Sequence, residues 1–302
     1  MTTPASRYDY RFDPSGDSTA AQVCRMVGHN KNVLELGCAA GAMSAVLAGH
    51  YQCRVTGVEY DPTAAESARA YCQEVLVASL DTPDWPTPLN GRTFDTVVAA
   101  DVLEHLHAPE NCLAEVGKLL EENGRLVVSV PSIAHSGVLA QLMLGEFEYT
   151  DIGLLDRTHV HFFTRQSLGR MLHANGFKVI ETATVDTGPW HPEFSESWQR
   201  LPVPVHDWLA GNPAGRAYQV LMLAQRCDNP GTWSEPDTAQ QAWLESFPSN
   251  VETDPEALVR ISREADELRQ QCHALQLQLK QMQQSQSWRL TAPLRKIARL
   301  LK

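Results

Sequence analysis

The sequence lacks features that mark several large classes of protein. It has no run of about 18 apolar residues, the length that spans a bilayer, and residues 1–17 contain no apolar core of the kind found in signal peptides. Its 7 cysteines are scattered, without a CxxC pair to indicate a zinc or redox site. Basic residues are few, because 25 Lys and Arg stand against 36 Asp and Glu. We therefore expect a cytoplasmic protein that binds no nucleic acid.

Apolar residues are plentiful enough for a full core, at 43% of 302 positions. From Ser18 onward, short apolar runs alternate with helical stretches, which predicts an α/β fold with a Rossmann-like, doubly wound sheet. We expect strands over 33–36, 54–58, 73–77, 94–100, 126–130, 177–185 and 218–225. We expect helices over 42–49, 109–122 and 164–174, the last two ending on the Asn-Gly pairs at 123–124 and 175–176.

The composition changes after this domain, which we place at 18–227 behind an N-terminal segment, 1–17. Residues 228–254 are rich in Pro, Ser, Thr and Asp and lack a clear period, so we expect a linker. Over 255–302, apolar residues recur at spacings of three and four, which favours a coiled coil and a homo-oligomer over a single amphipathic helix folded back. The seam contains Leu258, Ile261, Ala265, Leu268, Cys272, Leu275, Leu279 and Met282.

The chain ends in a basic amphipathic segment, SWRLTAPLRKIARLLK, which contains no acidic residue. On an acidic protein such a segment indicates contact with a membrane surface, here the inner face, or with an acidic partner. A solvated helix end is the alternative.

A glycine turn follows the first expected strand, in the stretch VLELGCAAG that ends at Gly41. Gly37 and Gly41 let the backbone pass close to a ligand. Glu35 precedes the turn, and an acid there suits a cationic amino-acid ligand better than a phosphate. Glu59 ends the next strand, where it can accept hydrogen bonds from a ribose diol. These features favour a nucleoside with an amino-acid group over a plain nucleotide.

The stretches VLELGCAAG, VTGVEYD and FDTVVAADVLEHL resemble successive motifs of the class I S-adenosylmethionine-dependent methyltransferases, above all the small-molecule group with the ubiquinone O-methyltransferases. The resemblance covers about two thirds of the chain and implies S-adenosyl-L-methionine as cofactor. It places Glu35 near the methionine amino group, Glu59 on the ribose and Tyr60 beside the adenine. The implied methionine contacts are Gly37, Cys38, Ala39 and Gly41; the cofactor wall is completed by Ala100 and Asp101.

The adenine contact departs from the family pattern. Where members often carry an acid after the third strand, this chain has Val77-Ala-Ser-Leu-Asp81. Ser79, Leu80 and Asp81 are the candidates for this contact.

A hydroxyl acceptor needs a base, because a sulfonium methyl is already a strong electrophile. His105 follows the fourth strand, where α/β folds place groups that face ligands, and an imidazole titrates near neutral pH. Its alternative role is to order the loop. Asp101, Glu104 and His105 also match by spacing a magnesium triplet of the ubiquinone group, but we assign no residue to a metal.

A second polar cluster, DRTHVHFFTR, spans 156–165 after the fifth strand. If this piece is extended, His159 and His161 point to one face. Asp156 and His159 could then bind a polyol or accept its proton; His159 could instead be structural. Thr164 fits the cap of the next helix.

The stretch DRTHVHFFT and the ending SWRLTAPLR resemble methyltransferases of bacterial surface-glycan assembly. The resemblance implies an O-methyltransferase acting on a saccharide hydroxyl. The alternatives are the same reaction on a phenolic or quinone-like molecule, and a non-catalytic cofactor-binding scaffold acting through its coiled coil.

Overall fold

The computed structural model describes residues 11–227, 230, 233, 238–246 and 5 isolated positions between 263 and 274. The chain divides into two compact units, Met1–Glu245 and Ser246–Lys302. The expected coiled coil and basic end, 255–302, therefore lie outside the described residues apart from those isolated positions. Among the described residues, no helix has the length and apolar character needed to cross a bilayer.

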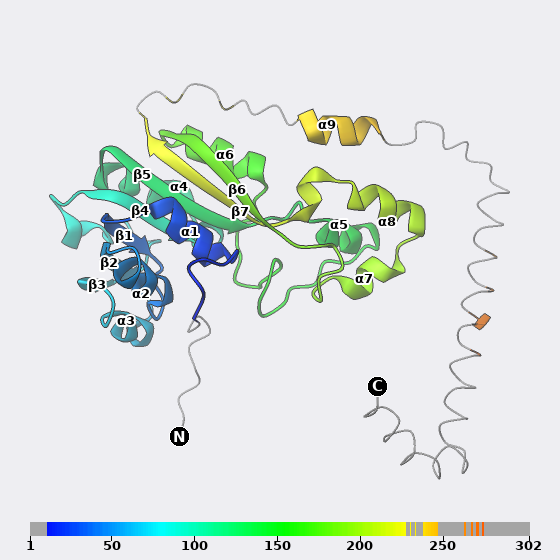
Figure 1. Cartoon of the computed structure of the whole chain (residues 1–302), viewed down its shortest axis with the longest axis horizontal. Helices are drawn as coiled ribbons and strands as arrows, with labels where there is room; N and C mark the ends of the chain where they lie inside the picture. Colours follow the sequence, from blue (N-terminus) through cyan, green and yellow to red (C-terminus); the bar gives the residue numbers. More distant parts are fainter. Residues whose placement is uncertain are drawn as a thin grey trace, which may run out of the picture. The chain divides into compact units, whose positions relative to one another are not determined.

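A seven-stranded sheet forms the centre of the first unit, with the strand order β3-β2-β1-β4-β5-β7-β6 (Figure 1). Neighbouring strands are parallel except at β7, which runs antiparallel to β5 and β6. The strands are β1 (Asn32–Leu36), β2 (Arg54–Glu59), β3 (Glu74–Val77), β4 (Phe94–Ala100), β5 (Leu120–Pro131), β6 (Phe177–Asp186) and β7 (Ala217–Arg226). The strand order reverses between β1 and β4, and ligands of such sheets bind at the carboxyl ends of the strands beside this point.

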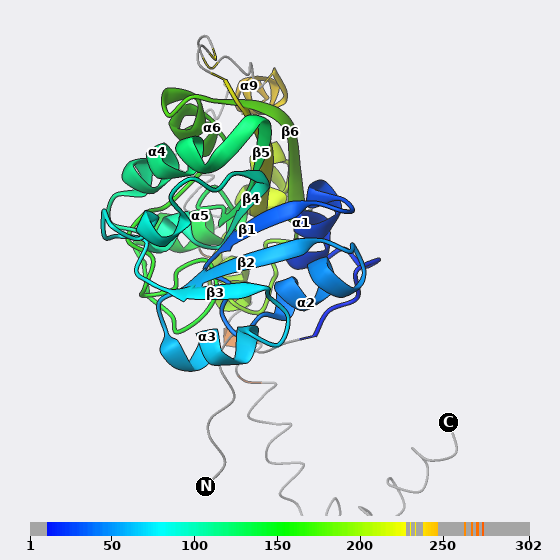
Figure 2. The same cartoon turned by 90° about the vertical axis from the view of Figure 1, so that its left-hand side faces the viewer.

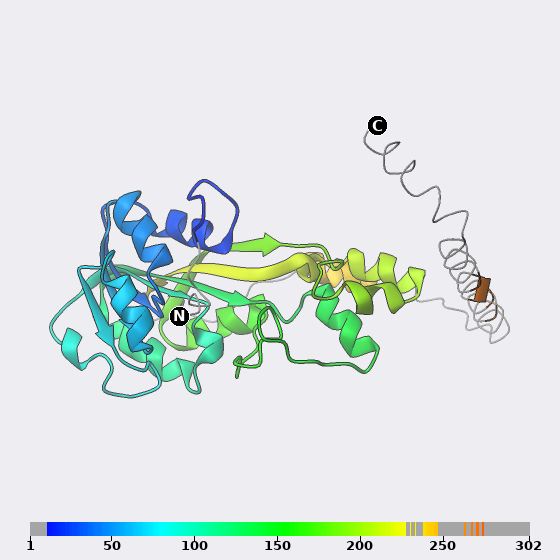
Figure 3. The same cartoon turned by 90° about the horizontal axis from the view of Figure 1, so that it is seen from below.

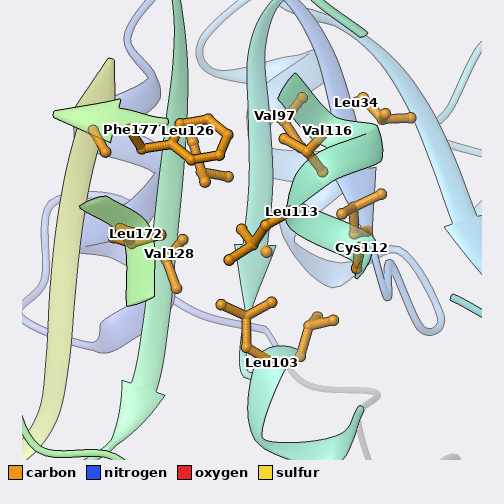
Figure 4. Packing of buried hydrophobic residues seen from close by; sticks show 14 of the residues in the cluster. Leu34, Val97, Leu103, Cys112, Leu113, Val116, Leu126, Val128, Leu172 and Phe177 are labelled. Atoms are coloured by element: carbon orange, nitrogen blue, oxygen red, sulfur yellow. The ribbon is translucent and has the colours of Figure 1, made fainter. Parts of the chain in front are cut away.

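Helices cover both faces of the sheet, as the apolar runs of the strands predict. Val33 and Val98 pack with α1 (Thr19–Val27) and α2 (Ala42–Gly49), whereas Leu34 and Val97 pack with α4 (Pro109–Leu119) and α6 (Arg165–Ala174). Figure 2 shows the two layers, and Figure 4 shows the side chains of α4 and α6 against the strands. A further helix, α3 (Pro62–Ala68), lies beside β2 and β3.

A helical cap lies beyond the carboxyl ends of the central strands (Figures 1 and 3). The connection from β5 to α6 contributes α5 (Ser136–Met143), and the connection from β6 to β7 contributes α7 (Ser195–Arg200) and α8 (Val203–Ala210). Three short 3₁₀ turns complete the connections: η1 (Thr87–Leu89), η2 (Leu103–His105) and η3 (Pro213–Arg216).

The stretch that the sequence indicates to be a linker contains a helix, α9 (Thr238–Glu245). Trp243 stacks on Trp208 of the cap with ring centroids 4.2 Å apart, and its indole N–H donates to the Trp208 carbonyl oxygen at 2.8 Å. Residues 238–245 of the expected linker thus form a helix that packs on the cap. A helix this short has too few turns for a visible period, and one tryptophan anchors it.

The expected helix 109–122 is also corrected. Helix α4 ends at Leu119, and β5 starts at Leu120 with a bulge, because its pairing with β4 shifts between Phe94 and Thr96. Leu119 and Leu120 are both buried, so the chain enters the sheet at once, and Gly124 does not adopt a positive φ. By contrast, α6 begins at the Thr164 cap as expected and is followed by a left-handed Gly176 with φ 80°.

Candidate functional site

The turn after β1 holds three residues with positive φ: Gly37 at 65°, Ala39 at 46° and Gly41 at 86°. The backbone N–H groups of Gly37 and Cys38 donate to the Val58 carbonyl oxygen, which fixes the turn against β2. Gly41 then caps α2. The left-handed conformation is strained for Ala39, and the turn presents backbone instead of side chains to the carboxyl edge of the sheet.

Glu35 lies under this turn with 3% of its surface exposed. The Ser44 hydroxyl donates to its Oε2 at 2.6 Å. Burial raises the pKa of Glu35 to about 8, against the opposing effect of the Ser44 hydrogen bond. A cation beside this carboxyl would lower its pKa and favour the carboxylate, so Glu35 is suited to bind an ammonium group.

Glu59 closes the other side of the turn. Its Oε2 accepts from the Ala39 N–H at 2.9 Å, and its Oε1 accepts from the N–H groups of Tyr60 and Asp61 at 3.0 and 2.9 Å. A carboxylate offers about four acceptor positions, so one remains for a ligand hydroxyl. Glu59 therefore has a structural role that the sequence did not reveal, because it ties β2 to the glycine turn.

The residues expected on the adenine side lie at the ends of β2 and β3. Tyr60 is 76% exposed. Ser79 is exposed, and Leu80 packs partly into the main core. The Asp81 carboxylate accepts from the His107 backbone N–H at 2.8 Å and pairs with His107 Nδ1 at 3.1 Å. Asp81 thus stabilises the loop after β4, and Tyr60, Ser79 and Leu80 remain as candidates for an adenine contact.

The loop after β4 packs directly on the glycine turn. A Cβ at Gly37 would lie 2.9 Å from Val102 Cγ2. Ala100 packs against the core on the α1 side, and Asp101 has φ 53° and accepts from the Ser129 hydroxyl at 3.2 Å. Desolvation raises the pKa of Asp101 to about 6. Glu35, Glu59 and Asp101 thus lie at the carboxyl ends of three neighbouring strands, and these acids are an electrostatic fit for a sulfonium ligand with an ammonium group.

The two predicted histidines meet in space although they come from distant segments. The rings of His105 and His159 lie edge to face with centroids 4.8 Å apart. His105 is half-buried and its Nδ1 lies 3.2 Å from the carbonyl and hydroxyl oxygens of Thr158. His159 is buried, and its Nδ1 lies 3.2 Å from the Leu154 carbonyl oxygen. Both residues therefore belong to one site at the end of β4.

The segment 156–164 is not a strand, so His159 and His161 do not share a face. His161 Nε2 lies 3.3 Å from the His107 carbonyl oxygen. Asp156 is buried and accepts from the Thr158 backbone N–H at 2.9 Å and from its hydroxyl at 2.8 Å. The segment thus presents His159 inward through a turn closed by Asp156.

Sequence reasoning missed a group of aromatic side chains beside His159. The Phe162 ring lies 6.4 Å from the His159 ring and 5.8 Å from that of Phe147, which in turn lies 5.4 Å from Tyr149. Phe147 and Tyr149 are 39% and 52% exposed. Exposed aromatic rings next to a polar pair are typical of a binding surface, but only the folded chain brings them together.

Comparison with known proteins agrees with this geometry. A family model described as a methyltransferase domain matches residues 19–182. Among curated proteins, the mitochondrial ubiquinone biosynthesis O-methyltransferase of Schizosaccharomyces pombe is 28% identical over 53% of this chain and 59% of its own length. The malonyl-[acyl-carrier protein] O-methyltransferase of Geobacter sulfurreducens is 27% identical over 53% of this chain and 61% of its own. The chain thus spans about three fifths of these relatives.

Solved structures are similar in part. A methyltransferase-like protein from Bacillus halodurans has a TM-score of 0.49 at 15% identity, and the match covers 69% of this chain and 99% of that one. Magnesium protoporphyrin IX methyltransferase from Synechocystis has a TM-score of 0.46 at 18% identity, with 70% and 81% covered.

Proposed function

The chain belongs to the class I S-adenosylmethionine-dependent methyltransferases, and from this premise we propose that it methylates a hydroxyl oxygen, in the first place that of a saccharide. S-adenosyl-L-methionine is the methyl donor of the family. The observation that carries the proposal is the His105–His159 pair, whose rings lie 4.8 Å apart at the end of β4. The loop after β4, which carries His105, contacts the glycine turn where Val102 lies against Gly37.

We assign the donor to the edge of the sheet formed by the ends of β1, β2 and β4. The methionine part follows the turn of Gly37, Cys38, Ala39 and Gly41, with its amino group near Glu35. A ribose hydroxyl donates to the acceptor position that remains on Glu59. Tyr60, Ser79 and Leu80 surround the adenine, and Ala100 and Asp101 form the adjoining wall. The support for this assignment is the positive φ of the turn and the acid at the carboxyl end of each of these strands.

The donor supplies an electrophilic methyl group, so the chain has to align an acceptor oxygen and take its proton. In the reaction the oxygen–carbon bond forms as the carbon–sulfur bond breaks, and S-adenosylhomocysteine leaves. Either His105 or His159 accepts the hydroxyl proton, since the two rings share one site. Half-buried His105 lies nearer the surface than His159, which favours it for contact with the acceptor.

A saccharide acceptor is supported by the hydroxyl and imidazole groups around Thr158. It is also supported by the resemblance of the stretch DRTHVHFFT to glycan-associated methyltransferases. A phenolic or quinone-like acceptor is the second candidate. It is favoured by the exposed rings of Phe147 and Tyr149 beside Phe162 and by the O-methyltransferase names of the curated relatives.

The test is methyl transfer from labelled S-adenosylmethionine to nucleotide-sugars, lipid-linked oligosaccharides and catechols. We expect label on a saccharide. Label on catechols alone would shift the assignment to the phenolic acceptor. Cofactor binding without transfer to any acceptor class would favour the scaffold function.

We further propose that residues 255–302 join copies of the chain and that the basic end holds the catalytic domain at the inner membrane face. The heptad spacing and the basic composition of the segment support this. Deleting 255–302 should lower the mass measured by light scattering while S-adenosylmethionine binding is kept. An unchanged mass would contradict the assembly, and equal binding of both forms to anionic vesicles would contradict the membrane contact.

A further inference from the structure

Glu104 is the most unusual side chain of the site. Only 1% of its surface is exposed, and neither Oε1 nor Oε2 has a hydrogen-bond partner. A buried carboxyl without a partner costs several kcal/mol by rough estimate. Burial, with the nearby acids Asp101 and Asp156, raises the pKa of Glu104 well above its ordinary value. Burial and the two neighbouring acids therefore both oppose the charged form of this carboxyl.

Two imidazoles face the same point. Glu104, His105 and His159 each offer one metal-ligand atom, and these three atoms lie within 4.8 Å of one another. The three residues are the candidate metal-binding group among the described residues. Tetrahedral zinc ligands at about 2.1 Å from the ion lie about 3.4 Å apart, so small side-chain rotations would bring these atoms to bonding distance. Residues 104 and 159 are held together by the backbone, because the N–H groups of Val160 and His161 donate to the Glu104 carbonyl oxygen.

Both histidines are oriented in the way that metal ligands usually are. A ligand imidazole normally donates its other N–H to a carbonyl oxygen, which fixes its tautomer. His159 Nδ1 lies 3.2 Å from the Leu154 carbonyl oxygen, and His105 Nδ1 lies 3.2 Å from that of Thr158. These contacts favour Nδ1–H on both rings and put the lone pair on Nε2.

We propose that Glu104, His105 and His159 bind a divalent first-row transition ion, with zinc as its first representative. Two imidazoles and one carboxylate suit such ions better than magnesium, which prefers oxygen ligands. The site differs from the single-turn triplet of Asp101, Glu104 and His105 because the β5–α6 connection supplies a ligand.

The role of the ion rests on the proposed function. Bound to the acceptor hydroxyl, a divalent ion lowers the pKa of that hydroxyl and aligns its oxygen. The proton then passes to water, and His105 and His159 act as ligands instead of bases.

The test is calorimetric titration of the full-length, tag-free protein with Zn²⁺ after dialysis against EDTA. We expect one ion per chain at this site, and a loss of affinity of at least about tenfold in Glu104→Gln and in His159→Asn. His50→Asn is the matched control, because His50 is an exposed histidine at the end of α2; its affinity should equal that of the wild type. Equal affinity in all four proteins, or no binding to the wild type, would overturn the proposal.

A measurement on the wild type alone covers the case in which a variant does not fold. Co²⁺ at a site with two imidazoles gives visible d–d absorption that Zn²⁺ should abolish at one equivalent. Absence of these bands would overturn the proposal. Failure of the proposed function is distinguishable, since a protein that binds Zn²⁺ but transfers methyl to no hydroxyl refutes the acceptor while the metal site stands. Loss of transfer in His105→Asn and in His159→Asn, without any metal binding to the wild type, would instead support base catalysis.

Discussion

Val102 occupies the space that a side chain at position 37 would need, since a Cβ on Gly37 would lie 2.9 Å from Val102 Cγ2. The relationship joins the glycine turn after β1 to the loop after β4. The glycine turn is assigned to the methyl donor, and the loop after β4 carries Glu104 and His105. A single added methyl group at position 37 should therefore disturb the contact between the turn assigned to the methyl donor and the loop assigned to the acceptor.

Gly37→Ala should destabilise the protein and weaken donor binding. The alanine meets Val102 and must also adopt φ 65°, which together cost about 1 to 3 kcal/mol. Gly91→Ala is the control, because Gly91 has φ 79° with nothing within 4 Å of a Cβ. Urea unfolding and S-adenosylmethionine titration of both variants check this. Equal effects would show that backbone strain alone acts and that the contact with Val102 is unimportant.

Glu35 should make stability depend on pH. Its folded pKa is about 8 against an ordinary 4.5, with burial as the cause. Between these values the folded state holds a proton that the unfolded state has lost, so stability falls as pH rises, by at most about 1.4 kcal/mol per pH unit. Above about pH 8 the contribution is constant.

The check is urea unfolding of the wild type and Glu35→Gln at intervals across that pH range. The glutamine variant should lack this part of the slope, because it cannot titrate. The same slope in both proteins would mean that Glu35 is ionised in the folded state.

Donor binding should release a proton near pH 7. The ammonium group assigned beside Glu35 favours its carboxylate, so a side chain protonated before binding loses its proton. Calorimetry in two buffers with different ionisation enthalpies should then give different apparent enthalpies, and Glu35→Gln should reduce the difference. Identical enthalpies for the wild type in both buffers would contradict the assignment of the donor's amino group to a place beside Glu35.

His105→Asn should reduce methyl transfer to the identified acceptor by about 10²- to 10⁴-fold and leave S-adenosylmethionine affinity unchanged, because His105 belongs to the acceptor side. His50→Asn, which changes an exposed histidine at the end of α2, is the control and should retain activity. Retained activity in His105→Asn would exclude His105 from the chemistry, whether as base or as ligand.

The sheet could be predicted from the sequence because each strand is a short apolar run and the turn after β1 is marked by Gly37 and Gly41. The β4 strand was predicted with its observed bounds, 94–100. The acids at 35 and 59 were predicted from their places before the glycine turn and at the end of the next strand, but the backbone hydrogen bonds of Glu59 needed the register of β1 against β2.

The cap could not be predicted in the same way. Its helices are short, and their packing depends on distant contacts, such as the hydrogen bond from the Ser136 hydroxyl to the Leu209 carbonyl oxygen. The cluster of Glu104 with His159 has the same origin, because only the path of the β5–α6 connection brings them together. Spacing within the sequence instead pointed to Asp101 as the partner of Glu104 and His105.

The central claim is that the glycine turn and Glu59 form the donor site, and calorimetric titration with S-adenosylmethionine tests it most directly. The wild type should bind one equivalent. Glu59→Ala should lose about 1.5 to 3 kcal/mol for each hydrogen bond to the ribose, whereas Glu66→Ala, at an exposed position paired with Arg69 on the surface, should bind as the wild type does. Unchanged affinity in a folded Glu59→Ala protein would contradict the account.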